Sequence, residues 1–346
     1  MTTSPFLQAL RGVRGDTLPV WFMRQAGRSL PEYRRARAGT TMLESCLDPA
    51  LAAELTCQPV RRHGVDAAVF FSDIMVPLKL AGVDVEIALG VGPVMGAPTR
   101  TDAEIAQLCG RGSGDQSVIT DGVALTVREL GDTTPVLGFA GAPFTLAAYL
   151  VEGRPSRDHL AARTLMHANP AGWQRLANWC ADVSVAFMKA QVAGGARAFQ
   201  LFDSWAGSLS RADYAKYCAP SSRKVLRAAH DLGIPTIHFG VGTGCMLDLF
   251  SEDATAVGVD YRTDLRTAIS VLRSVHSEPV IVQGNIDPAM LGCPPEVLEA
   301  HINTVITAGR NADAHILNLG HGVPKDTDPD VLTRLVARVH ERTAND

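Results

Sequence analysis

Short apolar runs alternate with longer segments of helical periodicity along most of the chain. An unbroken apolar run of about five residues is typical of a strand covered on both faces, whereas apolar residues three and four positions apart indicate a helix. The runs predict eight strands, over residues 18–22, 67–71, 135–139, 197–202, 234–238, 254–259, 279–283 and 315–318.

Helical periodicity fills most of the intervals between the runs. Strands that alternate with helices in this number fit a (β/α)8 barrel better than an open doubly wound sheet. No dinucleotide or Walker glycine fingerprint follows any run, and no repeat or linker divides the chain. We therefore expect an α/β fold, a single-domain (β/α)8 TIM barrel over residues 1–346 with its core at about 5–342. The predicted helices span 49–63, 117–130, 143–151, 159–168, 171–193, 210–231, 262–275, 294–309 and 328–342.

One interval departs from this alternation. Segment 81–100 is rich in glycine, valine and proline, which predicts a hairpin or an extended excursion whose position relative to the cleft stays open. In a barrel of this type the active-site cleft lies at the C-terminal ends of the strands.

Composition narrows the function classes. The chain is 46% hydrophobic with a formal net charge of −4, which argues against a general nucleic-acid or membrane-surface binder. No apolar run reaches transmembrane length, and the first residues lack the basic region and apolar core of a signal peptide. The 7 cysteines are widely spread without a C-x-x-C pair, which indicates reduced thiols rather than a zinc site. We expect a cytoplasmic protein whose affinity for anions, if present, is local.

Residues 24–37 concentrate positive charge in this acidic chain: they contain five arginines and a single acid, Glu32. The segment directly follows the first predicted strand. Arginine stays ionised and offers a planar fork of donors that suits carboxylates and phosphates. The segment therefore predicts a site for a polyanionic ligand, and a solvated basic helix is the alternative.

Asp73 is the most specific of the polar residues that follow predicted strands. It comes after the run 67–71 with no histidine or second acid within several residues, which makes a poor metal site. A lone carboxylate there can accept several N–H donors or act as counter-ion to a cation formed during a reaction. The alternative is a helix N-cap formed by Ser72 or Asp73.

Other polar residues near strand ends permit both functional and structural interpretations. His321 lies between two glycines, either exposed to a ligand or hydrogen-bonded in a turn, whereas His238 is more typical of a buried histidine with a protein partner. Asn285 and Asp287 fit capping or loop closure. Ser204 has no histidine beside it and no nucleophile elbow, so serine-hydrolase chemistry is not predicted.

Six stretches, in this order along the chain, resemble the uroporphyrinogen decarboxylase family. The resemblance extends over about residues 5–340. It implies a (β/α)8 barrel, a homodimer, and an enzyme that uses no metal or organic cofactor. The implied reaction removes the four acetate carboxyls of uroporphyrinogen III to give coproporphyrinogen III, with no nucleic-acid or membrane partner. The stretches are residues 23–33, 71–74, 138–153, 201–207, 283–288 and 318–322.

The resemblance also implies site residues. Trp205 stands where some relatives have histidine and Tyr261 where tryptophan is common, and the loop His238–Gly244 is less typical, so its role stays open. The residues implied as catalytic are Asp73, Arg24, Tyr149 and His321, and those implied in substrate binding are Arg24, Gln25, Ala26, Arg28, Arg37, Asp73, Tyr149, Phe202, Ser204 and His321.

Two rival interpretations remain. The related cobalamin-linked methyltransferases hold zinc with a His-x-Cys motif and a distant cysteine, but the stretch His238–Gly240 lacks that cysteine and no other His-x-Cys occurs. A non-catalytic tetrapyrrole-binding protein is the second rival, against which the retention of Asp73 together with the arginines argues.

Overall fold

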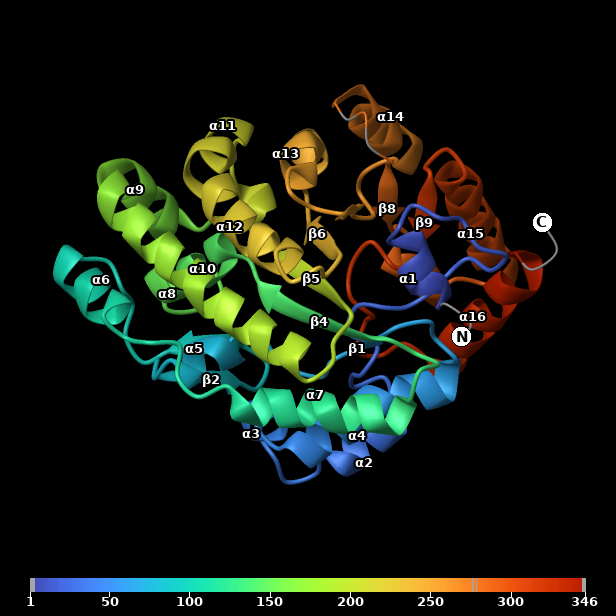
Figure 1. Ribbon diagram of the computed structural model, residues 1–346, viewed down its shortest axis with the longest axis horizontal. Helices are drawn as coiled ribbons and strands as arrows, with labels where there is room; N and C mark the ends of the chain where they lie inside the picture. Colours follow the sequence, from blue (N-terminus) through green and yellow to red (C-terminus); the bar gives the residue numbers. More distant parts are fainter. Residues whose placement is uncertain (1–3, 276, 278, 344–346) are drawn as a thin grey trace.

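The computed structural model describes residues 4–275, 277 and 279–343. Its centre is a curled parallel sheet of seven strands in the order β1-β4-β5-β6-β7-β8-β9, surrounded by helices (Figure 1). Sequential strands are neighbours and all pair in parallel, as βαβ crossovers require. The strands are β1 Ala68–Val69, β4 Val136–Gly141, β5 Ala198–Asp203, β6 Thr236–Gly240, β7 Ala256–Gly258, β8 Ile281–Gln283 and β9 Ala314–Ile316.

The helices confirm every predicted helical segment, with shifts of a few residues at the ends. The segment 210–231 is interrupted by a π-helical turn, η2, and several short helices were not predicted. The helices are α1 Pro5–Ala9, α2 Pro31–Ala36, α3 Met42–Cys46, α4 Pro49–His63, α5 Val76–Leu80, α6 Asp102–Cys109, α7 Ser117–Leu130, α8 Pro143–Glu152, α9 Leu160–Ala168, α10 Pro170–Ala193, η1 Ala206–Ser208, α11 Arg211–Asp213, η2 Tyr214–Cys218, α12 Ala219–His230, η3 Gly244–Met246, α13 Leu247–Ser251, α14 Leu265–Val275, η4 Pro288–Gly292, α15 Pro295–Gly309 and α16 Pro329–Thr343.

The first predicted strand, 18–22, is not a strand in the structure. Its contact with the sheet is a single parallel bridge from Val20 to Leu317. Side chains take the backbone N–H groups that a ladder would use: Phe22 N–H, for example, donates to Oε1 of Gln25 at 3.0 Å. These side-chain acceptors interrupt the backbone ladder along segment 18–22, so the hydrogen bonds of the structure define a sheet of seven strands.

Segment 81–100 forms the predicted hairpin, with antiparallel strands β2 Val85–Ala88 and β3 Gly92–Met95. Backbone hydrogen bonds fasten it to helix α8: Met95 N–H donates to Gly153 O, and Thr99 N–H donates to Leu150 O, both at 2.8 Å. These two bonds hold segment 81–100 against the helix that carries Tyr149.

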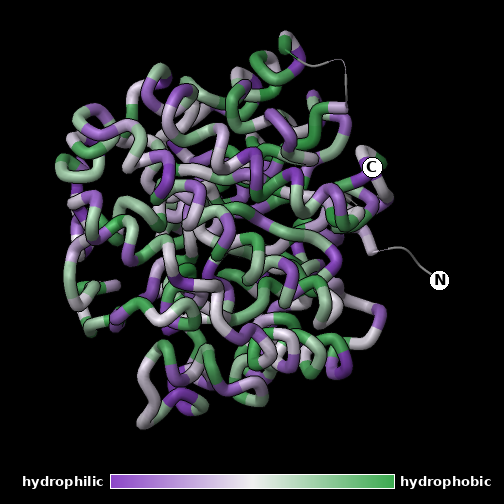
Figure 2. Tube along the Cα trace, turned by 60° about the vertical axis from the view of Figure 1, so that its left-hand side comes forward, coloured by the Kyte–Doolittle hydropathy of each residue, from purple (hydrophilic) through white to green (hydrophobic). Residues whose placement is uncertain are grey.

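Burial follows the strand pattern: β4 and β6 are buried along their whole length. All seven cysteines are free thiols, and four of them are buried as small core residues. Hydrophobic and hydrophilic positions are interspersed along the trace (Figure 2). No helix in the described part of the chain is both long and apolar enough to cross a membrane.

Candidate active site

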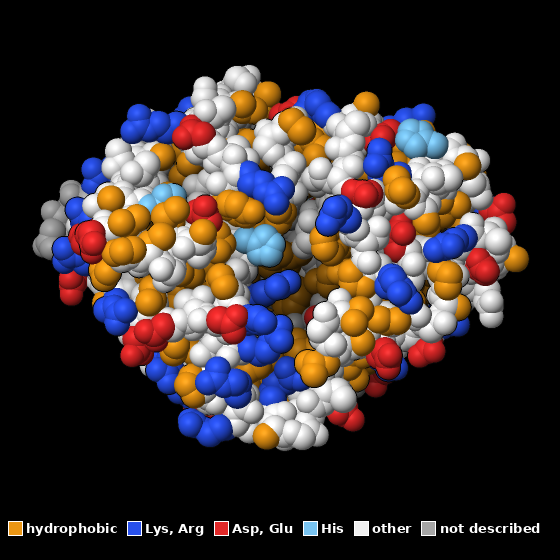
Figure 3. Space-filling view, turned by 180° about the vertical axis from the view of Figure 1, so that it is seen from behind, with side chains coloured by type: hydrophobic (Ala, Val, Ile, Leu, Met, Phe, Trp, Pro, Cys, Tyr) orange, Lys and Arg blue, Asp and Glu red, His pale blue; other side chains and the backbone are white. Residues whose placement is uncertain are grey.

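The face behind the view of Figure 1 has a hollow near its centre (Figure 3). Lysine and arginine side chains gather along one side of the hollow, and a histidine lies at its margin. The sequence predicts such a concentration of positive charge at the mouth of the cleft.

Arg24 links the residues predicted to be catalytic. Its backbone is left-handed, with φ of 63°, which is uncommon for a residue other than glycine. Its side chain passes so close to Gly322 that a Cβ atom there would lie 2.6 Å from Arg24 Cδ, so a larger residue at 322 would require the Arg24 side chain to move. Burial raises the pKa of Asp73 and of Tyr149, and the Arg24 charge opposes both shifts; burial lowers the pKa of His321, and the Arg24 charge lowers it further. Arg24 therefore lies close enough to Asp73, Tyr149 and His321 for its charge to act on all three.

Asp73 takes the structural role that the sequence offered as the alternative. Its Oδ1 accepts a hydrogen bond from Met75 N–H at 2.9 Å and so caps the turn that leads into α5. No hydrogen bond in the described part of the chain involves Oδ2. Burial raises the pKa of Asp73 above its ordinary value, even though the Met75 bond and the Arg24 charge oppose the shift. One carboxylate oxygen is structural and the other is free for a ligand.

The basic segment keeps its charge unneutralised. Its one acid, Glu32, accepts hydrogen bonds from Arg62 Nε at 2.6 Å and Nη2 at 2.9 Å instead. Among residues 4–275, 277 and 279–343, no ion pair involves Arg24, Arg28 or Arg37. Unpaired guanidinium groups are suited to carboxylates supplied by a ligand.

The arginines of this segment differ in how their donors are used. Arg37 donates to Tyr33 Oη at 2.6 Å and to Ser45 Oγ at 3.0 Å, so much of its donor capacity is already used. Arg34 is exposed and donates to the carbonyl of Arg28 at 2.6 Å, which holds the turn. The exposed side chain of Arg28 has no such bond in the described residues, and it remains free for a ligand.

Gln25 and Ala26, both predicted to bind the substrate, differ in how deeply they are buried. The Gln25 side chain is fully buried, and its Nε2 donates to Ala67 O at 3.0 Å while its Oε1 accepts from the chain nearby. This amide shapes the turn, and the Gln25 backbone N–H donates to Phe22 O at 3.1 Å, so only the carbonyl of Gln25 is left for a ligand. Ala26 is half-buried.

Tyr149 projects from α8 and is buried. Burial raises its pKa to about 12, and the Asp73 charge adds to the rise, whereas the neighbouring Trp205 side chain and the charge of Arg24 oppose it. The phenol is therefore protonated at neutral pH and able to donate.

Two further predicted binding residues flank the end of β5. Phe202 is half-buried and packs edge-on against Phe139, with ring centroids 5.6 Å apart. Ser204 is half-buried too, and its hydroxyl takes part in no hydrogen bond among the residues that the structure describes. Ser204 thus leaves a donor and an acceptor open.

His321 is both a turn residue and a neutral donor. Its Nδ1 accepts a hydrogen bond from Gly322 N–H at 2.7 Å. Burial lowers the pKa of the ring, and the charges of Arg24 and Arg262 lower it further. A neutral ring with a lone pair on Nδ1 carries its proton on Nε2, which can donate.

The remaining strand-end residues serve the scaffold. His238 is buried, with Nδ1 3.1 Å from Phe250 O and its ring stacked on the Phe250 ring. Asn285 donates from Nδ2 to Asp260 O at 2.9 Å, and Asp287 caps η4. The predictions of capping and loop closure are confirmed.

Sequence reasoning gave too little weight to three residues near the site. Trp205 is the second residue after β5 and Arg262 the fourth after β7, so their positions near strand ends could have selected both. His159 lies between helices with a left-handed φ of 48° and gave no sequence signal.

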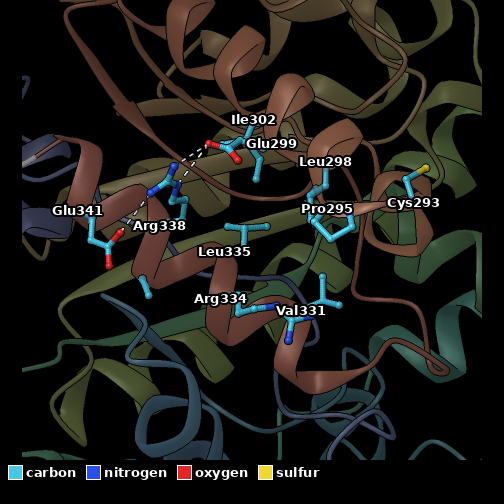
Figure 4. A pocket seen from close by; sticks show the side chains of 11 residues that line it. Cys293, Pro295, Leu298, Glu299, Ile302, Val331, Arg334, Leu335, Arg338 and Glu341 are labelled. Atoms are coloured by element: carbon cyan, nitrogen blue, oxygen red, sulfur yellow. Dashed lines mark hydrogen bonds and ion pairs between the residues drawn. The ribbon is translucent and has the colours of Figure 1, made fainter.

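A second hollow, of about 490 Å³, lies between α15 and α16 (Figure 4). Its lining contains none of the predicted site residues, and an ion pair of 3.0 Å between Arg338 and Glu299 borders it. Within the described residues, no group of three or more His, Cys, Asp and Glu side chains is arranged to hold a metal ion.

Comparison with known proteins identifies the family. The family model described as Uroporphyrinogen decarboxylase (URO-D) matches residues 1–342. The uroporphyrinogen decarboxylase of Arthrobacter sp. is 56% identical over 338 residues, covering 97% of this chain and 96% of that protein. The protein of that name from Streptomyces avermitilis is 52% identical, with 99% and 95% covered.

A solved methyltransferase from Methanosarcina mazei has a similar fold, with a TM-score of 0.77 and 18% identity over 97% of each chain. An identity this low shows the fold alone. The family model and the curated relatives, by contrast, extend over nearly the whole sequence. This chain belongs to the uroporphyrinogen decarboxylase family.

Proposed function

We propose that the chain decarboxylates the four acetate side chains of uroporphyrinogen III to give coproporphyrinogen III. The observation that carries the proposal is the pairing of unneutralised arginines with a carboxylate that has one free oxygen. The substrate has the complementary chemistry, with carboxylates at its rim and pyrrole N–H groups at its centre. Arg24 and Arg28 bind rim carboxylates, and Arg37 supports them from its bonds to Tyr33 and Ser45.

Asp73 accepts the central N–H groups through Oδ2. Protonation of an electron-rich pyrrole carbon makes a cation, which takes up the electrons released when carbon dioxide leaves, so the substrate supplies its own electron sink. A carboxylate held beside that cation stabilises the transition state more than the ground state. Burial raises the pKa of Asp73, and the charge of Arg24 opposes that rise and so helps to keep the carboxylate ionised.

The proton donor is chosen from Arg24, Tyr149 and His321. Arginine is a weak acid and is better suited to binding carboxylates. Tyr149 and His321 are both protonated donors at neutral pH, for the reasons given above, so either can hold a carboxylate or deliver a proton. Ser204, Phe202 and the backbone of residues 25–26 complete the pocket.

The assembly is part of the proposal. We infer that segment 18–22 closes the curled sheet into an eight-stranded barrel, supported by bonds from Leu317 N–H to Pro19 O and from Asp66 N–H to Val20 O, both at 2.8 Å. The family resemblance further implies a single-domain homodimer in the cytoplasm. Light scattering on the protein as it elutes from a size-exclusion column measures its molar mass and so tests the dimer.

The direct test is anaerobic incubation of the chain with uroporphyrinogen III under reducing conditions, with no cofactor added, followed by counting the carboxyls on the products. Products with seven to four carboxyls are expected, ending at four. A product that keeps all eight would contradict the proposal, and binding without release of carbon dioxide would favour a tetrapyrrole-binding protein.

A further inference from the structure

The turn that follows β7 carries an arginine, Arg262, most of whose donors are unused. Its Nε donates to Tyr261 Oη at 3.2 Å, and its guanidinium carbon lies 5.5 Å from the centroid of the Tyr261 ring. Among residues 4–275, 277 and 279–343, neither Nη nitrogen takes part in a hydrogen bond or an ion pair. The side chain is exposed, so these donors are available to a ligand.

The nearby acid, Asp260, is engaged by the turn that carries Arg262. Asp260 is buried, and its Oδ2 accepts from Gly242 N–H at 2.6 Å while its Oδ1 accepts from Thr263 Oγ1 at 2.7 Å. Its carbonyl accepts from Asn285 Nδ2 at 2.9 Å. Both carboxylate oxygens therefore fix the turn, and no ion pair in the described part of the chain joins Asp260 to Arg262.

Close backbone packing places this turn at the candidate site. Tyr261 N–H donates to Gly320 O at 3.3 Å, and a Cβ atom at Gly320 would collide with the Tyr261 backbone. On the other side of His321, a Cβ atom at Gly322 would lie 2.6 Å from Arg24 Cδ. His321 is thus flanked by the two segments that carry these arginines. Burial lowers the pKa of His321, and the charges of both arginines lower it further, in agreement with this arrangement.

The guanidinium of Arg262 also reaches the loop that follows β6. Its Nη1 lies 3.7 Å from the position that a Cβ atom at Gly242 would occupy, and Gly207 Cα lies 3.6 Å from the same position. Gly207 comes after β5 and Gly242 after β6, so the carboxyl ends of neighbouring strands meet beside Arg262. Binding sites in this architecture are built from such strand ends.

We propose that Arg262 binds a substrate carboxylate on the far side of His321 from Arg24, and that this carboxylate is one of the four that the product retains. The inference rests on the proposed function, because it names the substrate group that Arg262 takes. A carboxylate that leaves as carbon dioxide gives up its electron pair to the protonated ring. An arginine paired with it would stabilise the ground state more than the transition state. A guanidinium at the cleft mouth is therefore better matched to a carboxylate that stays.

The test compares the substrate with coproporphyrinogen III, which carries only the retained carboxylates. Arg262→Gln should lower kcat/KM for uroporphyrinogen III and weaken binding of coproporphyrinogen III alike, by about five- to tenfold, between the effects of an exposed ion pair and a buried charged hydrogen bond. Because the lost contact exists before and during reaction, kcat should change less than KM. Anaerobic quenching of tryptophan fluorescence measures the dissociation constant of the product.

Two further variants make the comparison specific. Arg262→Lys keeps the charge without the planar fork and should recover part of the affinity. Arg266→Gln is the matched control, because Arg266 is an exposed arginine of α14 with no hydrogen bond or ion pair among the described residues. It removes the same charge four positions along the chain, and it should leave both constants within about twofold of the parent, as expected for an exposed charge.

Product binding needs no turnover, so it separates the two proposals. An inactive parent that binds coproporphyrinogen III, with weaker binding in Arg262→Gln, would defeat the proposed function and support the role of Arg262. The inference would be overturned by a parent that does not bind coproporphyrinogen III, or by an Arg262→Gln variant whose product dissociation constant equals that of the parent. Equal weakening in Arg266→Gln would also overturn it, because net charge would then account for the effect.

Discussion

Two arginine-rich regions of this chain place the same side chain in opposite electrostatic settings. In segment 24–37, Arg24 and Arg28 take part in no ion pair within the described residues. In α16, Arg338 pairs with Glu299 at 3.0 Å, and Arg342 lies 3.5 Å from the same carboxylate. The first region keeps its charge available, and the second uses its charge to join α15 to α16.

The difference shows that a count of arginines does not identify a binding site. Exposed ion pairs such as Arg338–Glu299 contribute about 0–1 kcal/mol to stability, because water and side-chain entropy offset the attraction. Unpaired arginines beside a partly buried carboxylate contribute nothing comparable to the fold, and they are suited to an anionic ligand. The comparison makes predictions that differ between the two regions.

The largest difference is expected when one acidic residue near each region is replaced by its amide. Asp73→Asn keeps the shape of the side chain and removes the charge that stabilises the pyrrole cation, so kcat should fall by about 10²–10³. Glu299→Gln is the matched change in the paired region and should leave kcat unchanged. Steady-state kinetics on both variants checks this, and equal losses would erase the distinction between the regions.

The next effect concerns the arginines themselves. Arg24→Gln removes a charge-assisted bond to a substrate carboxylate, and the resulting loss of about 1.5–3 kcal/mol corresponds to roughly 10- to 100-fold in kcat/KM. Arg338→Gln should stay within about twofold of the parent. If Arg338→Gln lowered kcat/KM as much as Arg24→Gln, surface charge in general would be responsible.

Raising the ionic strength should also distinguish the two regions, through a smaller change in kcat/KM than the substitutions above. Attraction between an anionic substrate and unpaired arginines is screened as ionic strength rises, so kcat/KM of the parent should fall several-fold between about 0.05 and 0.5 M. Arg28→Gln should weaken this dependence, and Arg342→Gln should not. Stopped-flow binding of substrate measures the slope, and identical slopes in all three proteins would be inconsistent with steering by the free arginines.

The smallest expected effect is a shift in the titration of His321. Burial and the charges of Arg24 and Arg262 lower its pKa below that of an unfolded histidine, near 6.5. The unfolded chain therefore takes up this proton first, so the contribution of His321 to stability is present above the unfolded pKa and is lost as pH falls toward the folded pKa.

Arg24→Gln removes one of those charges, so the His321 pKa should rise, while Arg338→Gln leaves it unchanged. Resonances of the His321 ring followed from pH 8 to pH 4 measure both. A His321 pKa that is the same in the parent and in Arg24→Gln would contradict an electrostatic interaction between the two residues.

The sequence predicts the order of elements well because buried strands and amphipathic helices have different periods. It predicts a strand at 18–22 wrongly, since apolar character does not reveal that Phe22 N–H bonds to the side chain of Gln25. The same limit applies to Gln25 as a binding residue. Its position in a matched motif is visible, and the burial of its amide is not.

The candidate site, like the fold, is predictable from the sequence only in part. Asp73 and the arginines can be selected from strand ends and charge, because chemistry in this architecture concentrates there. The pairing of Glu32 with Arg62, which leaves Arg24 and Arg28 unpaired, depends on packing between α2 and α4. His159 reaches Trp205 only through the fold, so no local pattern could have predicted that contact.

The most direct test of the account separates binding from chemistry in one experiment. Single-turnover decarboxylation of uroporphyrinogen III is followed over a range of enzyme concentrations for the parent, Asp73→Asn and Arg24→Gln, which gives a saturating rate constant and a dissociation constant for each. We predict that Asp73→Asn loses about 10²–10³ in the saturating rate, whereas Arg24→Gln loses mainly affinity. A saturating rate for Asp73→Asn close to that of the parent would contradict the claim that Asp73 stabilises the reacting pyrrole.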